Sequence, residues 1–214
     1  MSGSKMADKT RLSKRQLEIQ LGKLKILQKP NLKLEQYPVS AEAASELLYL
    51  AGFENKDLNG RVIDLGTGTG RLAIGAALMG AETPVGVDMD ERSLALAREN
   101  AETAGVEVEW VQSDIEKVNG RFDAVIMNPP YGTRTSHADT RFLEKAFQVA
   151  PVTYSVHKSA TRDFLVQFVK KSDRQVDQVR SMKMEIPHLF EFHEKKRETV
   201  EVDLYRIIRT PSRA

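Results

Sequence analysis

A mostly apolar run that stops at two consecutive prolines constrains the fold more than any other feature of this chain. Residues Phe122 to Met127 are followed directly by Asn128, Pro129, Pro130 and Tyr131. Such a run is typical of a strand buried on both faces of a parallel sheet. Proline lacks an N–H and has a fixed φ, so the strand cannot continue through the pair. We therefore predict a strand that ends at Asn128, at the edge of an open α/β sheet where ligands bind.

The segments around this strand alternate in type, which predicts a parallel sheet with right-handed crossovers. Other strands are expected at residues 62–65, 84–88, 106–111 and 152–156, and helices at 72–79, 91–103, 139–149 and 161–171. Two β-prone runs, 182–190 and 199–208, flank the charged segment 193–197. They predict an antiparallel pair that closes the sheet. The expected fold class is α/β, with helices on both faces.

The chain has 214 residues, enough for one domain of ordinary size with an N-terminal addition. Residues 1–12 are predicted to be a disordered basic tail, 13–58 a helical extension and 59–210 the sheet domain. Ser13 and Ser40 are expected N-caps of the two helices of the extension. No apolar run is long enough to span a membrane, and the polar N-terminus lacks the core of a signal peptide. We therefore expect a soluble, cytoplasmic protein.

Charge is distributed unevenly along the chain. Residues 1–40 carry nine Lys/Arg and three Asp/Glu, residues 153–214 carry thirteen and nine, and residues 41–152 carry ten and eighteen. Basic ends around an acidic centre are compatible with a nucleic-acid binder that contacts phosphates at its periphery, or simply with a solvated surface. The absence of cysteine excludes disulfides and thiolate metal sites, and the four histidines show no metal-ligand spacing. No metal site is expected.

The residues after the fourth strand suit a planar substrate that carries an NH2 group. The Asn128 amide oxygen and the Pro129 carbonyl are acceptors for the two amine hydrogens, and Tyr131 offers a flat face for stacking. Pro130 helps to keep this backbone rigid. The alternative is that Asn-Pro-Pro-Tyr is only a stiff turn.

A glycine loop upstream favours a cofactor. It runs from Asp64 through Gly66, Thr67, Gly68 and Gly70, and Arg71 stands where a dinucleotide motif would need its third glycine. A dehydrogenase is therefore disfavoured. The loop and its acid suit S-adenosylmethionine, a cation with an amino-acid end.

Two more acids follow the next strands along the chain. Asp88 is predicted to bind the ribose hydroxyls of the cofactor, and Asp114 the adenine amine, with Ile115 against the ring. The alternatives are that Asp88 caps the helix beginning near Glu91 and that Asp114 caps a short turn.

With these residues in place, the chain resembles the class I S-adenosylmethionine-dependent methyltransferases. Within this class it resembles the subgroup that carries an Asn-Pro-Pro-Tyr/Phe motif and methylates planar amino groups. Four further stretches narrow the resemblance to the methyltransferase-like family, of archaeal and eukaryotic type, that makes N6-methyladenosine in small-subunit ribosomal RNA. These stretches are 34–37, 128–133, 154–159 and 192–196, and the similarity extends over about 13–209. Tyr131 stands where many members have Phe, and Ser40 replaces a nearby Thr.

The resemblance implies a Rossmann-like sheet of seven mostly parallel strands whose last strand is antiparallel. It also implies that the extension covers the cofactor through Gln36, Tyr37 and Ser40, and that Met89 and Asn128 contact the cofactor. Asn128, Pro129, Pro130 and Tyr131 would form the catalytic set. In eukaryotic relatives a small zinc-binding activator protein pairs with the sheet edge, which corresponds here to the strand at 106–111.

Basic residues beyond the fifth strand are predicted to contact RNA. They are His157 and Lys158 after that strand, and His193, Lys195 and Lys196 in the last hairpin. The alternatives are a histidine satisfied inside the fold and a solvated loop. Two rival functions also stay open: methylation of a glutamine side chain in a translation-related protein, and a non-catalytic RNA-binding assembly factor.

Overall fold

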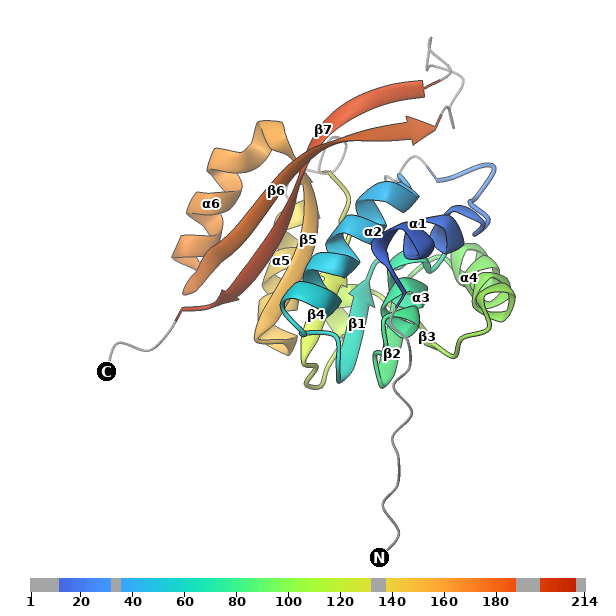
Figure 1. The fold of residues 1–214 in the computed structure, drawn as a ribbon. Coiled ribbons are helices and arrows are strands. Elements are labelled where there is room, and N and C mark those ends of the chain that lie inside the picture. The colour runs from blue at the N-terminus through green and yellow to red at the C-terminus, as the bar shows by residue number, and fades with distance from the viewer. Residues whose placement is uncertain (1–11, 32–35, 132–137, 188–196, 211–214) are drawn as a thin grey trace, which may run out of the picture.

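The computed structural model describes residues 12–31, 36–131, 138–187 and 197–210. In these residues seven strands form one sheet in the order β3-β2-β1-β4-β5-β7-β6 (Figure 1). Strands β1 to β5 are parallel, whereas β7 is antiparallel to both of its neighbours. The predicted fold class is confirmed, including the antiparallel last strand.

The strands follow the predicted order with small shifts at their ends. Their bounds are β1 Arg61–Leu65, β2 Thr83–Asp88, β3 Glu109–Gln112, β4 Ala124–Met127, β5 Val152–Lys158, β6 Arg174–Pro187 and β7 Arg197–Arg209. Strand β4 ends at Met127, as the two prolines predict. Strand β3 is shorter than the predicted 106–111 and lies at the sheet edge, as expected for its alternating acidic residues.

Helices cover both faces of the sheet. Their bounds are α1 Lys14–Gly22, α2 Ala41–Tyr49, α3 Arg71–Leu78, α4 Glu91–Ala104, α5 Ala138–Val149 and α6 Arg162–Lys171, with short helical turns η2 Leu50–Glu54, η3 Ile115–Lys117 and η4 Ser159–Thr161. One buried cluster contains side chains of α1, α2 and α3, and a second contains those of α5 and α6. The sheet therefore lies between two hydrophobic cores.

The N-terminal extension shares the first of these cores. Ser13 caps α1 in a capping box with Gln16, and Ser40 caps α2 by accepting a hydrogen bond from the Ala43 N–H at 3.1 Å. Leu17 and Leu21 on α1 are fully buried. The two predicted caps are confirmed, while the division into 13–58 and 59–210 stays a prediction. The predicted tail lies outside the described residues except for Leu12.

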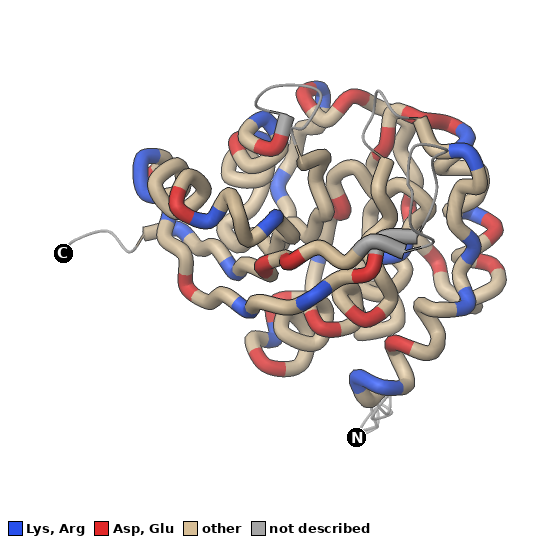
Figure 2. The backbone as a smooth tube through the Cα atoms, turned by 90° about the horizontal axis from the view of Figure 1, so that it is seen from above, with Lys and Arg blue, Asp and Glu red and all other residues tan. Residues whose placement is uncertain are grey.

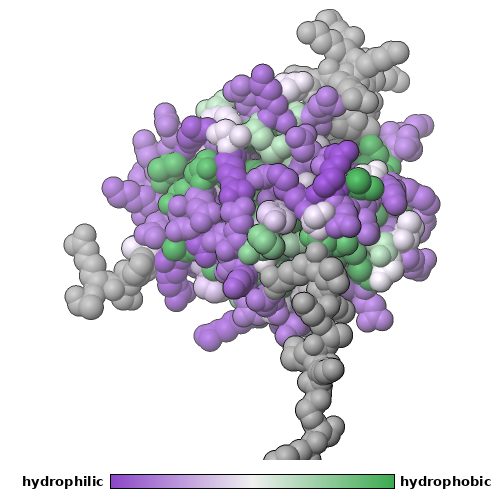
Figure 3. All heavy atoms as spheres, in the orientation of Figure 1, coloured by the Kyte–Doolittle hydropathy of each residue, from purple (hydrophilic) through white to green (hydrophobic). Residues whose placement is uncertain are grey.

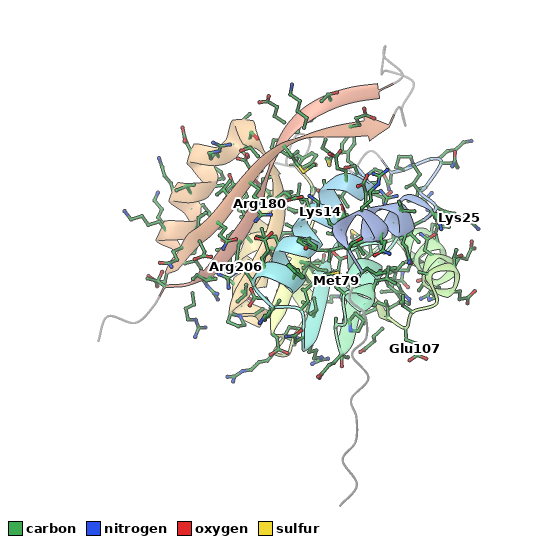
Figure 4. The ribbon with its side chains drawn as sticks, viewed as in Figure 1. Lys14, Lys25, Met79, Glu107, Arg180 and Arg206 are labelled. Carbon is green, nitrogen blue, oxygen red and sulfur yellow. The ribbon has the colours of Figure 1, made fainter. Side chains whose placement is uncertain are left out.

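The last two strands form a longer hairpin than predicted. Strand β6 begins at Arg174, not near residue 182, and pairs along its length with β7. Ion pairs join this hairpin to the extension, because Arg180 on β6, labelled in Figure 4, contacts Glu46 on α2 at 2.7 Å and Glu54 in η2 at 2.5 Å. The extension is therefore held against both the sheet and the hairpin.

The described surface is mixed in character. The face in Figure 3 is mainly hydrophilic, with scattered hydrophobic side chains. Seen from above in Figure 2, basic and acidic positions are interspersed. Within the described ranges, no helix has the length and apolar composition needed to cross a membrane.

Aromatic side chains pack tightly against the glycine loop. A Cβ built on Gly66 would lie 2.8 Å from Cε1 of Phe142, and one on Gly70 would lie 2.6 Å from Cη2 of Trp110. Both glycines have positive φ, +70° and +85°. Only glycine suits these two positions. Any other residue would strain the backbone at positive φ, and its Cβ would collide with the aromatic ring.

We predict that Gly70→Ala lowers the free energy of unfolding by about 2–4 kcal/mol, because it adds both backbone strain and overpacking. Gly105→Ala is the matched control, since Gly105 has φ +67° and a Cβ added there would have no other atom within 4 Å. For this control variant, the free energy of unfolding should fall by only about 1 kcal/mol. Urea titrations of both variants measure the difference, and equal losses would contradict the packing argument.

Candidate active site

A cavity of about 340 Å³ lies where the carboxyl ends of β1, β2 and β4 meet the extension. That volume is within the range of small-molecule sites. The predicted residues that line it are Gln36, Tyr37, Asp64, Gly66, Thr67, Gly68, Asp88, Met89, Asp114, Ile115, Asn128 and Pro130. The structure therefore brings most of the predicted cofactor residues together around one cavity.

Asp64 at the end of β1 is buried and holds the glycine loop. One carboxylate oxygen, Oδ2, accepts hydrogen bonds from the Thr67 hydroxyl at 2.6 Å and the Ala73 N–H at 3.1 Å. Burial raises the pKa of Asp64 to about 7, although these two hydrogen bonds oppose the rise. Asp64 thus fixes the start of α3 and places a carboxyl group beside the cavity.

Asp88 at the end of β2 links the loop to the next helix. Its carboxylate accepts from the Gly68 N–H at 2.8 Å and the Asp90 N–H at 2.9 Å. The N-cap of α4 is Asp90, so the alternative that Asp88 caps this helix is wrong. Burial raises the pKa of Asp88.

Gln36 connects the extension to the same region. Its amide nitrogen donates to Asp90 at 2.9 Å and to the Ser93 hydroxyl at 3.3 Å, and its amide oxygen accepts from the Asn31 N–H at 2.7 Å. Gln36 therefore ties two parts of the extension to the start of α4, over the cavity.

Asp114 follows β3 and has the capping role that the alternative predicted. Its side chain accepts from the Glu116 N–H at 3.0 Å at the start of η3. Asp114 also lines the cavity, as do buried Ile115 and exposed Met89. A cap and a ligand contact are compatible, because a carboxylate has acceptor sites for both.

The Asn128 side chain is oriented by the extension. Its amide nitrogen donates to the Tyr37 carbonyl oxygen at 2.9 Å, a contact between residues 91 positions apart. A carbonyl oxygen can only accept, so the amide nitrogen must face it. Asn128 Oδ1 is consequently left as an acceptor at the cavity, where its partner is the Tyr131 hydroxyl at 3.4 Å.

Tyr131 lies between an aromatic ring and a cation. Its ring centroid is 6.2 Å from that of Tyr37, with the two planes inclined by 21°, and Lys158 Nζ lies 5.0 Å from the Tyr131 centroid. Burial raises the pKa of the Tyr131 hydroxyl, so this group stays neutral. Lys158 is therefore placed beside the predicted catalytic set, as expected for a substrate contact.

His157 does not have the predicted RNA contact. It is 2% exposed, its Nε2 lies 2.7 Å from the Ser155 hydroxyl, and its ring meets the Tyr205 ring edge-on. Burial lowers its pKa to about 3, so it is neutral. The alternative of a histidine satisfied inside the fold is correct. Alternation along β5 explains the error, because residues 157 and 158 point to opposite faces.

Other predicted residues lie outside the cavity lining. Ser40, Gly70, Pro129 and Tyr131 are near it but do not line it, and the Ser40 hydroxyl is used by the α2 cap. His193, Lys195 and Lys196 lie outside the described residues, so their roles stay predictions.

Sequence reasoning missed several lining residues. They include Val39, Arg71, Ser93, Arg141 and Phe142. Arg71 directly follows the glycine loop, so its position in the sequence could have identified it as a residue of the cavity. Phe142 and Arg141 come from α5, and nothing in their local sequence indicates the approach of that helix to the loop.

The buried carboxyl group of Asp64 should make the stability of the protein depend on pH. Its pKa is raised from 3.8 to about 7 on folding, so the folded state holds this proton more tightly than the unfolded state. Stability of the ligand-free protein should therefore fall as pH rises from about 4 to 7. The contribution of Asp64 between pH 5 and pH 7 is roughly 2–3 kcal/mol. Urea unfolding across this range should show that Asp64→Asn makes the decrease smaller by about this amount, with the part due to Asp88 remaining, whereas parallel profiles for the two proteins would contradict the prediction.

Comparison with known proteins identifies the family. A model described as the methyltransferase small domain matches residues 40–153. The rRNA N(6)-adenosine-methyltransferase METTL5 of Danio rerio is 33% identical over 92% of this chain and 99% of its own. The uncharacterized protein MJ0284 of Methanocaldococcus jannaschii is 36% identical over 92% and 94%. A crystal structure from Pyrococcus horikoshii, described as a candidate RNA methyltransferase, has a TM-score of 0.86 and 40% identity over 93% of this chain and 98% of that one. The chain therefore belongs to the methyltransferase small-domain family, in the group that includes METTL5.

Proposed function

We propose that this protein transfers the methyl group of S-adenosylmethionine to the N6 amine of an adenosine in small-subunit ribosomal RNA. The observation that carries the proposal is the orientation of Asn128, whose Oδ1 is left as an acceptor at the cavity by the Tyr37 carbonyl. The full-length similarity to an enzyme named as an rRNA N(6)-adenosine-methyltransferase supports the choice of acceptor.

The residues around the cavity fit the cofactor. Asp64, Asp88 and Asp114 line it at the ends of successive strands, and Ile115 and Met89 add apolar surface. We assign Asp64 to the amino-acid end, Asp88 to the ribose, and Asp114 with Ile115 to the adenine. When bound, S-adenosylmethionine supplies an activated methyl group, so no protein nucleophile is needed. Gln36 and Tyr37 would hold the extension over this site.

The Asn-Pro-Pro-Tyr segment would position the adenine amine. We assign Asn128 Oδ1 and the Pro129 carbonyl as acceptors for the two amine hydrogens, which would hold the nitrogen in place and stabilise the positive charge that develops on it. The 3.4 Å contact from the Tyr131 hydroxyl to Oδ1 is long, so substrate can displace it. The Tyr131 ring would then stack on the base, and Pro130 keeps the segment rigid.

The proposed acceptor implies an accessible nucleotide. A paired base must leave its helix to enter a cavity of this kind, and this costs least for an unpaired base. Lys158 beside Tyr131, and Lys195, Lys196 and His193 of the hairpin, are the proposed RNA contacts. We also assign the enzyme to the cytoplasm, because its proposed substrate is ribosomal RNA. The exposed edge at β3 is where a small zinc-binding activator would pair.

Two rival functions make different predictions. A glutamine carboxamide presents the same planar NH2 group, so the Asn128 geometry alone does not separate the two acceptors. A non-catalytic assembly factor would have no need for an acceptor held at the cavity in this way. The nature of the methylated product decides among the three.

The deciding experiment incubates the protein with methyl-labelled S-adenosylmethionine and unmodified small-subunit rRNA, then digests the RNA to nucleosides. We expect label in N6-methyladenosine. Asn128→Ala should lower kcat/KM by about 100-fold or more, because an acceptor present at the reacting nitrogen is lost. Its affinity for S-adenosylhomocysteine, measured by calorimetry, should change little.

Asn119→Ala is the matched control, since the exposed Asn119 side chain donates only to the Lys117 carbonyl among the contacts observed. It should keep full activity. Label in a translation factor but not in RNA would favour the glutamine acceptor, and cofactor binding without any product would favour the assembly factor.

The proposed contact of Lys158 with RNA can be tested separately from catalysis. Lys158→Ala should weaken binding of all RNA sequences similarly and reduce the slope of log K against log salt by about 1. The control is Lys56→Ala, because Lys56 is exposed before β1, at the opposite end of that strand from the cavity. Filter binding at several salt concentrations measures both variants, and an unchanged slope for Lys158→Ala would exclude a phosphate contact.

A further inference from the structure

An acidic and a basic side chain at the cofactor cavity each have a buried polar atom for which the described residues provide no hydrogen-bond partner. They are Asp64, through Oδ1, and Arg71, through Nε. Both residues line the cavity. Buried polar atoms in folded proteins are nearly always satisfied, so an unsatisfied pair at a ligand site indicates groups that the ligand completes.

Arg71 is a largely buried cation without a described counter-ion. Its guanidinium donates to the carbonyl oxygens of Leu24 and Val39, which leaves three of its five N–H groups for other partners. No carboxylate among the described residues forms an ion pair with it. Burial lowers the pKa of Arg71, which reflects the same lack of a compensating charge. Buried charges are normally paired, because desolvation is otherwise too costly.

The charges of Asp64 and Arg71 match a zwitterion. Asp64 is an acceptor for a cationic amine, and Arg71 is a planar donor suited to a carboxylate. The amino-acid end of S-adenosylmethionine has one group of each kind. The other arginine that lines the cavity, Arg141, is already paired with Glu116 at 2.6 Å.

We propose that Arg71 binds the α-carboxylate of the cofactor, opposite the contact of Asp64 with the α-amine. The inference rests on the cofactor of the proposed function but not on its RNA acceptor. Arg71 also contacts two carbonyls of the extension, so the same side chain would join the cofactor to the segment that covers it. Its position after Gly70 places it at the first turn of α3.

The test compares S-adenosylmethionine with its decarboxylated form, which keeps the amine and the sulfonium but lacks the carboxylate. Calorimetry with the full chain should show that the wild type binds the complete cofactor roughly tenfold to 100-fold more tightly. Arg71→Met should bind both compounds equally, near the wild-type affinity for the decarboxylated one. Arg141→Met should keep the wild-type preference, because its charge is used by Glu116.

Two outcomes would overturn the proposal. If the wild type does not distinguish the two compounds, no residue of the site recognises the carboxylate, and this result needs no variant that might misfold. If Arg71→Met weakens both compounds by the same factor, Arg71 only fastens the extension to the loop. Neither readout involves RNA, so an incorrect RNA assignment would leave both results unchanged.

Discussion

The hydrogen bond from the Asn128 amide to the Tyr37 carbonyl joins the two parts of the molecule on which the site depends. Asn128 follows a strand of the sheet, whereas Tyr37 belongs to the extension. The bond determines which end of the carboxamide is left at the cavity, and it does so with a backbone atom, which any residue at position 37 would supply. Gln36 and Arg71 provide further contacts between the extension and the sheet domain. Removal of the extension would therefore release the acceptor as well as uncover the cavity.

Much of the fold follows from local sequence patterns. The proline pair correctly places the end of β4, and Ser13 and Ser40 correctly mark two helix starts. The start of β6 was missed because the alternation from Arg174 is mostly polar, as is usual for an edge strand with one solvated face.

The site was predictable where it depends on strand ends and not where it depends on packing. Asp64, Asp88 and Asn128 meet because the carboxyl ends of parallel strands meet at one edge of a sheet. His157 was misplaced because sequence gives the alternation of a strand but not which set of residues faces inward. In the sequence Arg71 is only a departure from a dinucleotide motif, and its proposed role rests on contacts with carbonyls 32 and 47 residues away.

The uneven charge along the chain is partly compensated within the fold. Lys14 pairs with Glu46, Lys25 with Glu99, and Arg206 with Asp57. In each pair, a basic residue from one end of the sequence contacts an acidic residue from the central segment 41–152. An exposed pair such as Lys25–Glu99 contributes little stability, but all three pairs reduce the net positive charge available to a nucleic acid. Basic residues that have no acidic partner in the described part of the chain, such as Lys158, are therefore more informative about RNA contact than the charge totals of each segment.

Trp110 is the chain's single tryptophan, and its ring packs against Gly70 of the cofactor loop and Gly86 of β2. The protein thus has one intrinsic indole fluorophore, located behind the loop that would hold the cofactor. Its emission should report the state of that loop without any added label, so binding could be followed in real time in the unmodified protein. The edge strand that carries this ring is also the proposed activator edge, and the same signal would respond to a partner there.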